Sequence, residues 1–140
     1  MDEPNLDPAL HHNALIGLER INVVSLTVPS VWRPLHDAIR RHAGRPLSIL
    51  DVACGAGDLA IGLVLRARAR GVAVSMDGCD ISQTAIDHAR RRAAERGASV
   101  TFFQHEAVTR PLPRQYDVVV CSLFLHHLDE GDATRLLIAM

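Results

Sequence analysis

The sequence predicts an α/β fold, in which a doubly wound parallel sheet of about four strands follows a helical N-terminal segment. Two patterns lead to this prediction. Short, mainly apolar runs such as "LSILDV" and "YDVVVC" alternate with longer stretches whose apolar residues recur every three or four positions. Strands that are apolar on both faces belong in a parallel sheet covered by helices on each side. Right-handed crossovers would then bring the carboxyl ends of these strands to one edge.

The first 45 residues are predicted to be a lid-like helical segment of the same domain. Apolar residues at helical spacing occupy residues 9–24. Residues 30–43 repeat the pattern, and Gly44 follows as a stop signal. Trp32 is interpreted as part of the core of this segment rather than as a platform for a ligand.

Residues 46–140 are predicted to form the α/β unit. Its strands are expected at residues 47–52, 72–80 and 99–105, with a fourth beginning at residue 116, and its helices at residues 57–71, 82–97 and 132–140. Gly71 and Gly97 mark the ends of the first two helices. Pro111 and Pro113 make the link before the fourth strand a loop. The run Arg90–Arg92 is interpreted as a solvated helix face.

Composition excludes several functional classes. The chain has 140 residues, enough for one domain with a single core. Its 15 basic and 16 acidic residues give a net charge of −1, which provides no attraction for nucleic acid. No apolar run is long enough to cross a membrane. The 3 cysteines are widely spaced and lack metal-ligand spacing, which suggests buried thiols of a cytoplasmic protein and no metal site.

The stretch "LDVACGAGDLA" at residues 50–60 gives the clearest functional signal. Glycine lets a ligand approach the backbone at a helix start, so Gly55 and Gly57 suggest a ligand cradle, although two glycines alone could equally form a tight turn. Asp80 ends the next strand, where a carboxylate would accept both hydroxyls of a ribose. Asp51 lies before the loop and suits a ligand with an ammonium group better than a pyrophosphate. These residues predict a nucleoside-bearing cofactor.

Four segments together resemble the class I S-adenosylmethionine-dependent methyltransferases, which have a Rossmann-like fold. They are "LDVACGAGD", "DGCDIS", "HEAVTRPLP" and "YDVVVCSLFLHHL", in the order and spacing of that family, and they cover about residues 47–140. The resemblance implies methyl transfer from S-adenosyl-L-methionine to an unidentified, small-molecule acceptor. A NAD-binding oxidoreductase module is the less favoured alternative, since Ala60 stands where a dinucleotide motif has its third glycine.

The same resemblance implies a role for each motif. The glycine loop would hold the methionine part of the cofactor, with Asp51 acting through the loop or the ammonium group. Asp80 would bind the ribose, the residues after it and after the third strand would meet the adenine, and the end of the fourth strand would line the methyl-transfer side. Many family members have Asp where Glu106 stands. The cofactor-binding residues implied in this way are Asp51, Ala53, Cys54, Gly55, Gly57, Asp80, Ile81, Glu106, Ala107 and Cys121.

A catalytic group is harder to assign. A sulfonium methyl group is already activated, so such an enzyme mainly aligns and desolvates its reactants. A general base is needed only when the acceptor must lose a proton. His126 and His127, which follow the fourth strand, are the candidates, although a local packing or capping role is the favoured interpretation of this pair.

The family's domain has a seven-stranded sheet, of which this chain supplies about four strands. The sequence stops at Met140 within an apolar-periodic helix that has no capping residue, so we expect the N-terminal part of a longer enzyme. The fourth strand would then be an exposed edge, through which copies of the chain could pair as a homo-oligomer. The alternative function is a truncated, inactive or partner-dependent fragment that binds the cofactor.

Overall fold

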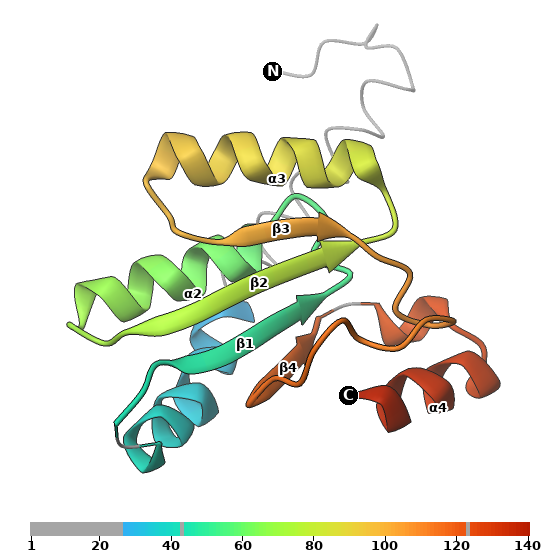
Figure 1. Ribbon diagram of the computed structural model, residues 1–140, viewed down its shortest axis with the longest axis horizontal. Helices are drawn as coiled ribbons and strands as arrows, with labels where there is room; N and C mark the ends of the chain where they lie inside the picture. The colour runs from blue at the N-terminus through green and yellow to red at the C-terminus, as the bar shows by residue number, and fades with distance from the viewer. Residues whose placement is uncertain (1–26, 43, 123) are drawn as a thin grey trace, which may run out of the picture.

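The computed structural model describes residues 27–42, 44–122 and 124–140 (Figure 1). The helix predicted over residues 9–24 lies outside this part of the chain. A helix over residues 27–41 is the first described element, and it overlaps most of the predicted range 30–43. No helix among the described residues is long and apolar enough to cross a bilayer.

The remaining elements alternate as predicted. They are β1 (Leu47–Val52), α2 (Asp58–Ala69), β2 (Val74–Asp80), α3 (Gln83–Arg96), β3 (Thr101–Gln104), β4 (Val118–Cys121), the 3-10 helix η1 (Leu125–His127) and α4 (Glu130–Ala139). β2 and β3 are shorter than the predicted ranges 72–80 and 99–105, and β4 begins after the predicted start at residue 116. The last helix begins before residue 132, because Asp129 caps it by accepting the N–H of Asp132 at 2.8 Å.

All strands of the described sheet are parallel, in the order β3-β2-β1-β4 (Figure 1). The chain steps outward from β1 through β2 to β3 and then returns to pair β4 with the other side of β1. This return is the switch in strand order at which doubly wound sheets bind their ligands. The doubly wound, Rossmann-like prediction is therefore confirmed, and β4 is an edge strand of the described sheet.

Successive strand residues alternate between two apolar clusters on opposite faces of the sheet. The larger cluster packs α2, α3 and the helix over residues 27–41 on one face, with Trp32, Leu35, Ile49, Ile61, Leu63, Met76, Ile86 and Phe102 among its members. Trp32 is only 5% exposed, as its interpretation as a core residue requires. The smaller cluster joins Leu50, Val52 and Cys79 to Ala107 and Leu136, so Leu136 anchors α4. Each fully buried Leu or Ile stabilises the fold by about 1.5–3 kcal/mol.

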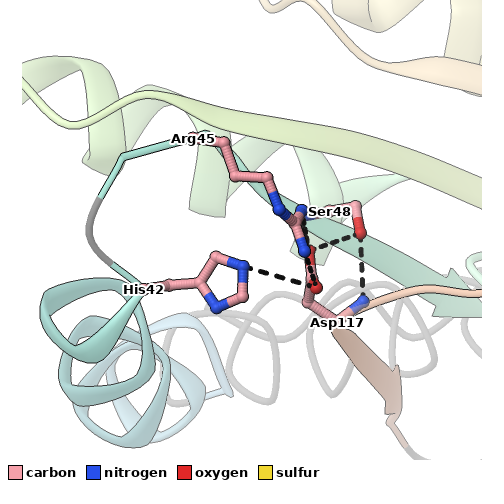
Figure 2. A network of polar contacts seen from close by, with 4 residues as sticks. All are labelled: His42, Arg45, Ser48 and Asp117. Carbon is pink, nitrogen blue, oxygen red and sulfur yellow. Dashed lines mark hydrogen bonds and ion pairs between the residues drawn. The ribbon is translucent and has the colours of Figure 1, made fainter.

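A polar network fixes the amino end of β4 against β1, and Figure 2 shows its residues. The Arg45 guanidinium donates to both carboxylate oxygens of Asp117, at 2.8 and 2.6 Å, while Ser48 donates its N–H at 2.8 Å and its hydroxyl at 2.7 Å. Nε2 of His42 lies 3.5 Å from the same carboxylate. The Arg45 and Ser48 hydrogen bonds hold the pKa of Asp117 well below its usual range. This network lies at the end of the sheet away from the expected site, so its role is to fix the strand.

Candidate functional site

The loop between β1 and α2 is held against the end of β2. The N–H of Cys54 donates to the carbonyl of Cys79 at 2.9 Å, and the N–H of Gly55 donates to Oδ2 of Asp80 at 2.9 Å. Within the loop, the N–H of Gly57 donates to the carbonyl of Cys54 at 2.9 Å. The loop therefore lies at the carboxyl edge of the sheet, where the sequence predicts the site.

The two glycines of the loop serve different purposes. Both have positive φ, 53° at Gly55 and 77° at Gly57, which L-residues with side chains rarely adopt. A Cβ at Gly57 would lie 2.7 Å from Cζ of Phe102 and 3.0 Å from Cβ of Ala89, so close packing also demands glycine there. A Cβ at Gly55 would meet no atom of the described part of the chain within 4 Å. The open space beside this backbone is therefore at Gly55, where a ligand can approach.

The loop starts with a strained residue. Ala53 has a φ of 55°, and among the described residues it is the only one other than glycine with positive φ. The left-handed conformation costs an L-residue about 1–2 kcal/mol. Such strain is typical of loops that bind ligands, because the surrounding contacts must hold a conformation that the local sequence disfavours.

Asp51 is a buried carboxylate to which the described residues bring no counter-charge. Asp51 is 2% exposed, and the backbone N–H of Ala60, in the first turn of α2, partly offsets the effect of burial on its pKa. Its Oδ2 has no hydrogen-bond partner, and no cationic side chain of the described residues forms an ion pair with it. Burial raises the pKa of Asp51 to about 7, and the nearby negative charge of Asp80 adds to this shift. The site therefore contains negative charge that a cationic ligand could neutralise.

Asp80 retains hydrogen-bonding capacity. Its Oδ2 accepts the N–H of Gly55, and its Oδ1 accepts the N–H of Ser82 at 2.8 Å. Each carboxylate oxygen has two lone pairs, so both oxygens can accept a further donor such as a hydroxyl group. The next side chain, Ile81, is 62% exposed, and its carbonyl accepts a hydrogen bond from the Gln104 side chain at 2.8 Å. An acceptor for hydroxyls thus lies beside an apolar side chain that the described residues leave mostly exposed.

The third and fourth segments reach the same edge. His105 donates its N–H to the carbonyl of Asp80 at 2.9 Å, which places the following residues Glu106, exposed, and Ala107, 8% exposed, beside the end of β2. Cys121 is half-buried and lies next to Val52 in the register of β4 and β1. The fold thus brings all four predicted segments to one edge.

The cysteines and the histidine pair have contrasting surroundings. Cys54, Cys79 and Cys121 are free thiols, and burial raises the pKa of each, to about 12 for Cys79 and about 11 for Cys121. Neutral thiols are poor nucleophiles, which agrees with a packing role. His126 and His127 are exposed in η1, directly after β4, and their ring centroids lie 3.9 Å apart. The described residues contain no cluster of His, Cys, Asp or Glu that could hold a metal ion.

One prediction for α3 is wrong in part. Arg90 donates to the carbonyl of Phe102 at 3.1 and 2.7 Å, and Arg92 donates to the carbonyl of Ala56 at 3.2 Å and forms an ion pair with Asp58. Arg90 and Arg91 are exposed and fit the solvated interpretation, with a 3.5 Å contact from Arg91 to the ring of its helix neighbour His88, whereas Arg92 is partly buried. Helical spacing carried the missing signal, because Arg90 and Arg92 flank the buried face of α3 at Ala89 and Ala93.

The sequence of the α/β unit is similar to that of known methyltransferases. The family model described as "Methyltransferase domain" matches residues 49–140. The ubiquinone biosynthesis O-methyltransferase of Azoarcus sp. is 35% identical over 115 residues, 75% of this chain and 47% of that protein. The demethylmenaquinone methyltransferase of Deinococcus radiodurans is 35% identical over 101 residues, 71% of this chain and 40% of that protein.

Solved structures show the same fold. Magnesium protoporphyrin IX methyltransferase of Synechocystis PCC 6803, crystallised with bound SAH, superposes with a TM-score of 0.64 at 23% identity, covering 97% of this chain and 55% of that one. The chain spans about half the length of the curated relatives it matches. From the family match and this fold, the chain belongs to the methyltransferase-domain family, specifically to the class I S-adenosylmethionine-dependent methyltransferases.

Proposed function

We propose that the chain binds S-adenosyl-L-methionine at the carboxyl edge of its sheet and directs the methyl group to a small-molecule acceptor. The observation that carries the proposal is the buried carboxylate of Asp51, whose Oδ2 has no hydrogen-bond partner among residues 27–42, 44–122 and 124–140. A buried and unpaired carboxylate is stabilised by a cation. S-adenosyl-L-methionine brings an ammonium and a sulfonium group, whereas the pyrophosphate of NAD would add negative charge beside Asp51 and Asp80.

The residues at this edge fit the parts of such a ligand. We assign the methionine part to Asp51 and the loop Ala53–Gly57, since the space beside Gly55 is open. We assign the ribose hydroxyls to the free lone pairs of Asp80 and the adenine to the exposed side chain of Ile81. The remaining assignments are the amino edge of the adenine for Glu106 and Ala107 and the methyl-transfer side for Cys121.

The bound cofactor supplies a methyl group that is already activated for attack by a nucleophile. The protein's task is then to align the acceptor and to exclude water. The apolar cluster that contains Val52, Ala107 and Cys121 provides an apolar surface beside the site, which disfavours water there. If the acceptor must lose a proton, His126 or His127 can take it, because both imidazoles follow β4 and are exposed.

The names of the relatives support a small-molecule acceptor. One relative is named for ubiquinone biosynthesis and another for demethylmenaquinone, so the names support a small molecule and differ on its identity. We also propose a cytoplasmic location, which the three free thiols support, and pairing of copies through the β4 edge. A second candidate function is cofactor binding without turnover, because the chain spans about half the length of these relatives.

Calorimetric titration with S-adenosylhomocysteine, S-adenosyl-L-methionine and NAD tests the proposal. We expect micromolar affinity for the first two and no measurable affinity for NAD. A preference for NAD would overturn the cofactor assignment. Incubation with S-adenosyl-L-methionine and hydroxylated aromatic acceptors then separates the two candidate functions, because cofactor binding without methylated product would favour the fragment.

A further inference from the structure

Side chains from two different elements hold the glycine loop from two sides. On one side, Asp80 at the end of β2 accepts the N–H of Gly55 at 2.9 Å. On the other side, Nη1 of Arg92 donates to the carbonyl of Ala56 at 3.2 Å, and Nη2 forms an ion pair with Asp58, the first residue of α2. One guanidinium therefore ties α3 both to the loop and to the helix that the loop enters.

This contact is partly shielded from water. The side chains of Arg92 and Asp58 are 28% and 31% exposed. The hydrogen bond to Asp58 raises the pKa of Arg92, so its charge persists across the physiological pH range. Because the guanidinium is a planar fork with several donors, it can serve a carbonyl and a carboxylate together, which a lysine ammonium does less well.

Two features of the glycine loop make it depend on contacts from other elements, such as those of Arg92. Gly55 contributes no side-chain packing, and a Cβ placed there would meet no described atom within 4 Å. Ala53 holds a conformation that costs energy, with a φ of 55°. A glycine-containing loop also has many alternative conformations, and ordering them during binding would reduce affinity. External contacts must therefore keep the loop in a single conformation before the ligand arrives.

We propose that Arg92 is a positioning residue, which holds the glycine loop in its cofactor-binding conformation through Ala56 and Asp58. This inference rests on the proposed function, which assigns the glycine loop to cofactor binding. In this proposal Arg92 acts through Ala56 and Asp58 and not by touching the ligand.

If Arg92 acted on the ligand only through its charge, removing it should strengthen cofactor binding, whereas loss of an anchor should weaken it. S-adenosyl-L-methionine carries a sulfonium charge, so loss of a nearby cation should favour its binding by simple electrostatics. Loss of an anchor should weaken binding of S-adenosyl-L-methionine and of uncharged-sulfur S-adenosylhomocysteine alike. Arg91→Ala is the matched control, because it removes the same charge from the same helix and, among the described residues, disturbs one 3.5 Å contact to His88.

Two measurements on the full chain test the proposal. In the unliganded protein, hydrogen exchange of the peptide spanning residues 53–58 should accelerate in Arg92→Ala and stay unchanged in Arg91→Ala. In calorimetry, Arg92→Ala should weaken binding of both ligands by about fivefold to tenfold, as expected for loss of one charge-assisted contact. Asp58→Asn should cause a similar loss, the double variant should lose little more than either single variant, and Arg92→Lys should recover part of the affinity.

The outcomes distinguish a failure of the proposed function from a failure of the role proposed for Arg92. If the wild-type chain binds neither ligand, the proposed function fails, while the exchange measurement still tests the anchor. If the wild type binds and Arg92→Ala binds equally well with unchanged exchange, Arg92 is not a positioning residue. Equal losses in Arg92→Ala and Arg91→Ala would also overturn the proposal, as would additive losses for Arg92 and Asp58. Thermal melts of every variant ensure that the comparison is made on folded protein, and Asp58→Asn provides the test if Arg92→Ala does not fold.

Discussion

The carboxylate of Asp80 accepts the backbone N–H of Gly55 at 2.9 Å and so joins the end of β2 to a loop 25 residues earlier in the chain. The other oxygen accepts the N–H of Ser82 at 2.8 Å, at the start of α3. One side chain thus fixes the loop and still has lone pairs toward the edge of the sheet. Its contribution to cofactor binding should include both roles.

Asp80→Ala should weaken S-adenosylhomocysteine binding by about 1–3 kcal/mol, because charge-assisted hydrogen bonds are lost. Calorimetry measures the change. Asp87→Ala is a matched control, since it removes a carboxylate from the exposed face of α3, where Asp87 accepts from Gln83 and Arg90. Unchanged affinity in Asp80→Ala would remove Asp80 from the site.

The two loop glycines should respond differently to alanine. Gly57→Ala places a Cβ 2.7 Å from the Phe102 ring in a left-handed conformation, so it should destabilise the fold by about 2–4 kcal/mol. Gly55→Ala has room for the Cβ and should cost only about 1 kcal/mol of stability, for its positive φ. Its main effect should be on S-adenosylhomocysteine affinity, since the methyl group occupies the open space. Urea unfolding measures the stability of each variant, and calorimetry measures its affinity for S-adenosylhomocysteine. Wild-type affinity in Gly55→Ala would contradict the assignment of the space beside Gly55 to the cofactor.

Ala53→Gly should stabilise the protein. Glycine adopts a φ of 55° without strain, and this gain exceeds the loss of one partly buried methyl group. The expected net increase in the free energy of unfolding is about 0.5–1 kcal/mol. Urea unfolding gives this value directly. A decrease would show that packing of the Ala53 methyl group outweighs the backbone strain.

The sequence pattern is sufficient to predict the sheet and the edge at which the candidate site residues meet. Apolar runs and helical spacing identify β1, β2, α2 and α3, because each buries a continuous apolar face. Parallel strands share one carboxyl edge, so Asp51 and Asp80 could be placed together without knowing any distance. The positive φ of Ala53 could not be predicted, since alanine does not favour it.

Contacts between distant segments also lie beyond the local pattern. Arg92 reaches Ala56 across 36 positions, and nothing near Arg92 in the sequence indicates that partner. The same holds for Asp77 in β2, which is 9% exposed and accepts from Arg114 at 2.8 Å and from Tyr116 at 2.9 Å. Such pairs depend on how the link before β4 crosses the sheet, and this tertiary arrangement has no periodic signal.

Asp117→Asn should loosen β4 from β1. The variant keeps the shape of the side chain but loses the charge that Arg45 and His42 face. Because the pKa of Asp117 is lowered in the folded state, its contribution is present above the unfolded value of about 4 and is lost as pH falls below it. We expect the Tm at pH 7 to fall by about 5 °C, with a smaller difference from wild type at pH 3. Equal differences at both pH values would contradict the role of the charge.

Asp51 should give the opposite pH dependence. Burial raises its pKa to about 7, whereas an unfolded aspartate titrates near pH 4. Between these values the folded state binds more protons than the unfolded state, so stability should fall as pH rises from about 4 to about 7. The groups that act on it are the carboxylate of Asp80, which raises its pKa, and the N–H of Ala60, which lowers it.

Asp51→Asn removes this titration, so the difference in stability between variant and wild type should change with pH. A shift of about 3 pKa units corresponds to a change of at most about 4 kcal/mol between pH 4 and pH 8, in favour of the variant at high pH. Urea unfolding at several pH values, without ligand, measures the difference. A cationic ligand should bind the ionised carboxylate, so binding to the wild type near pH 6 should release a proton, detected as a dependence of the calorimetric enthalpy on the buffer. Proton release that persists unchanged in Asp51→Asn would show that another group titrates, and a difference in stability that is constant with pH would show that Asp51 stays ionised in the folded protein.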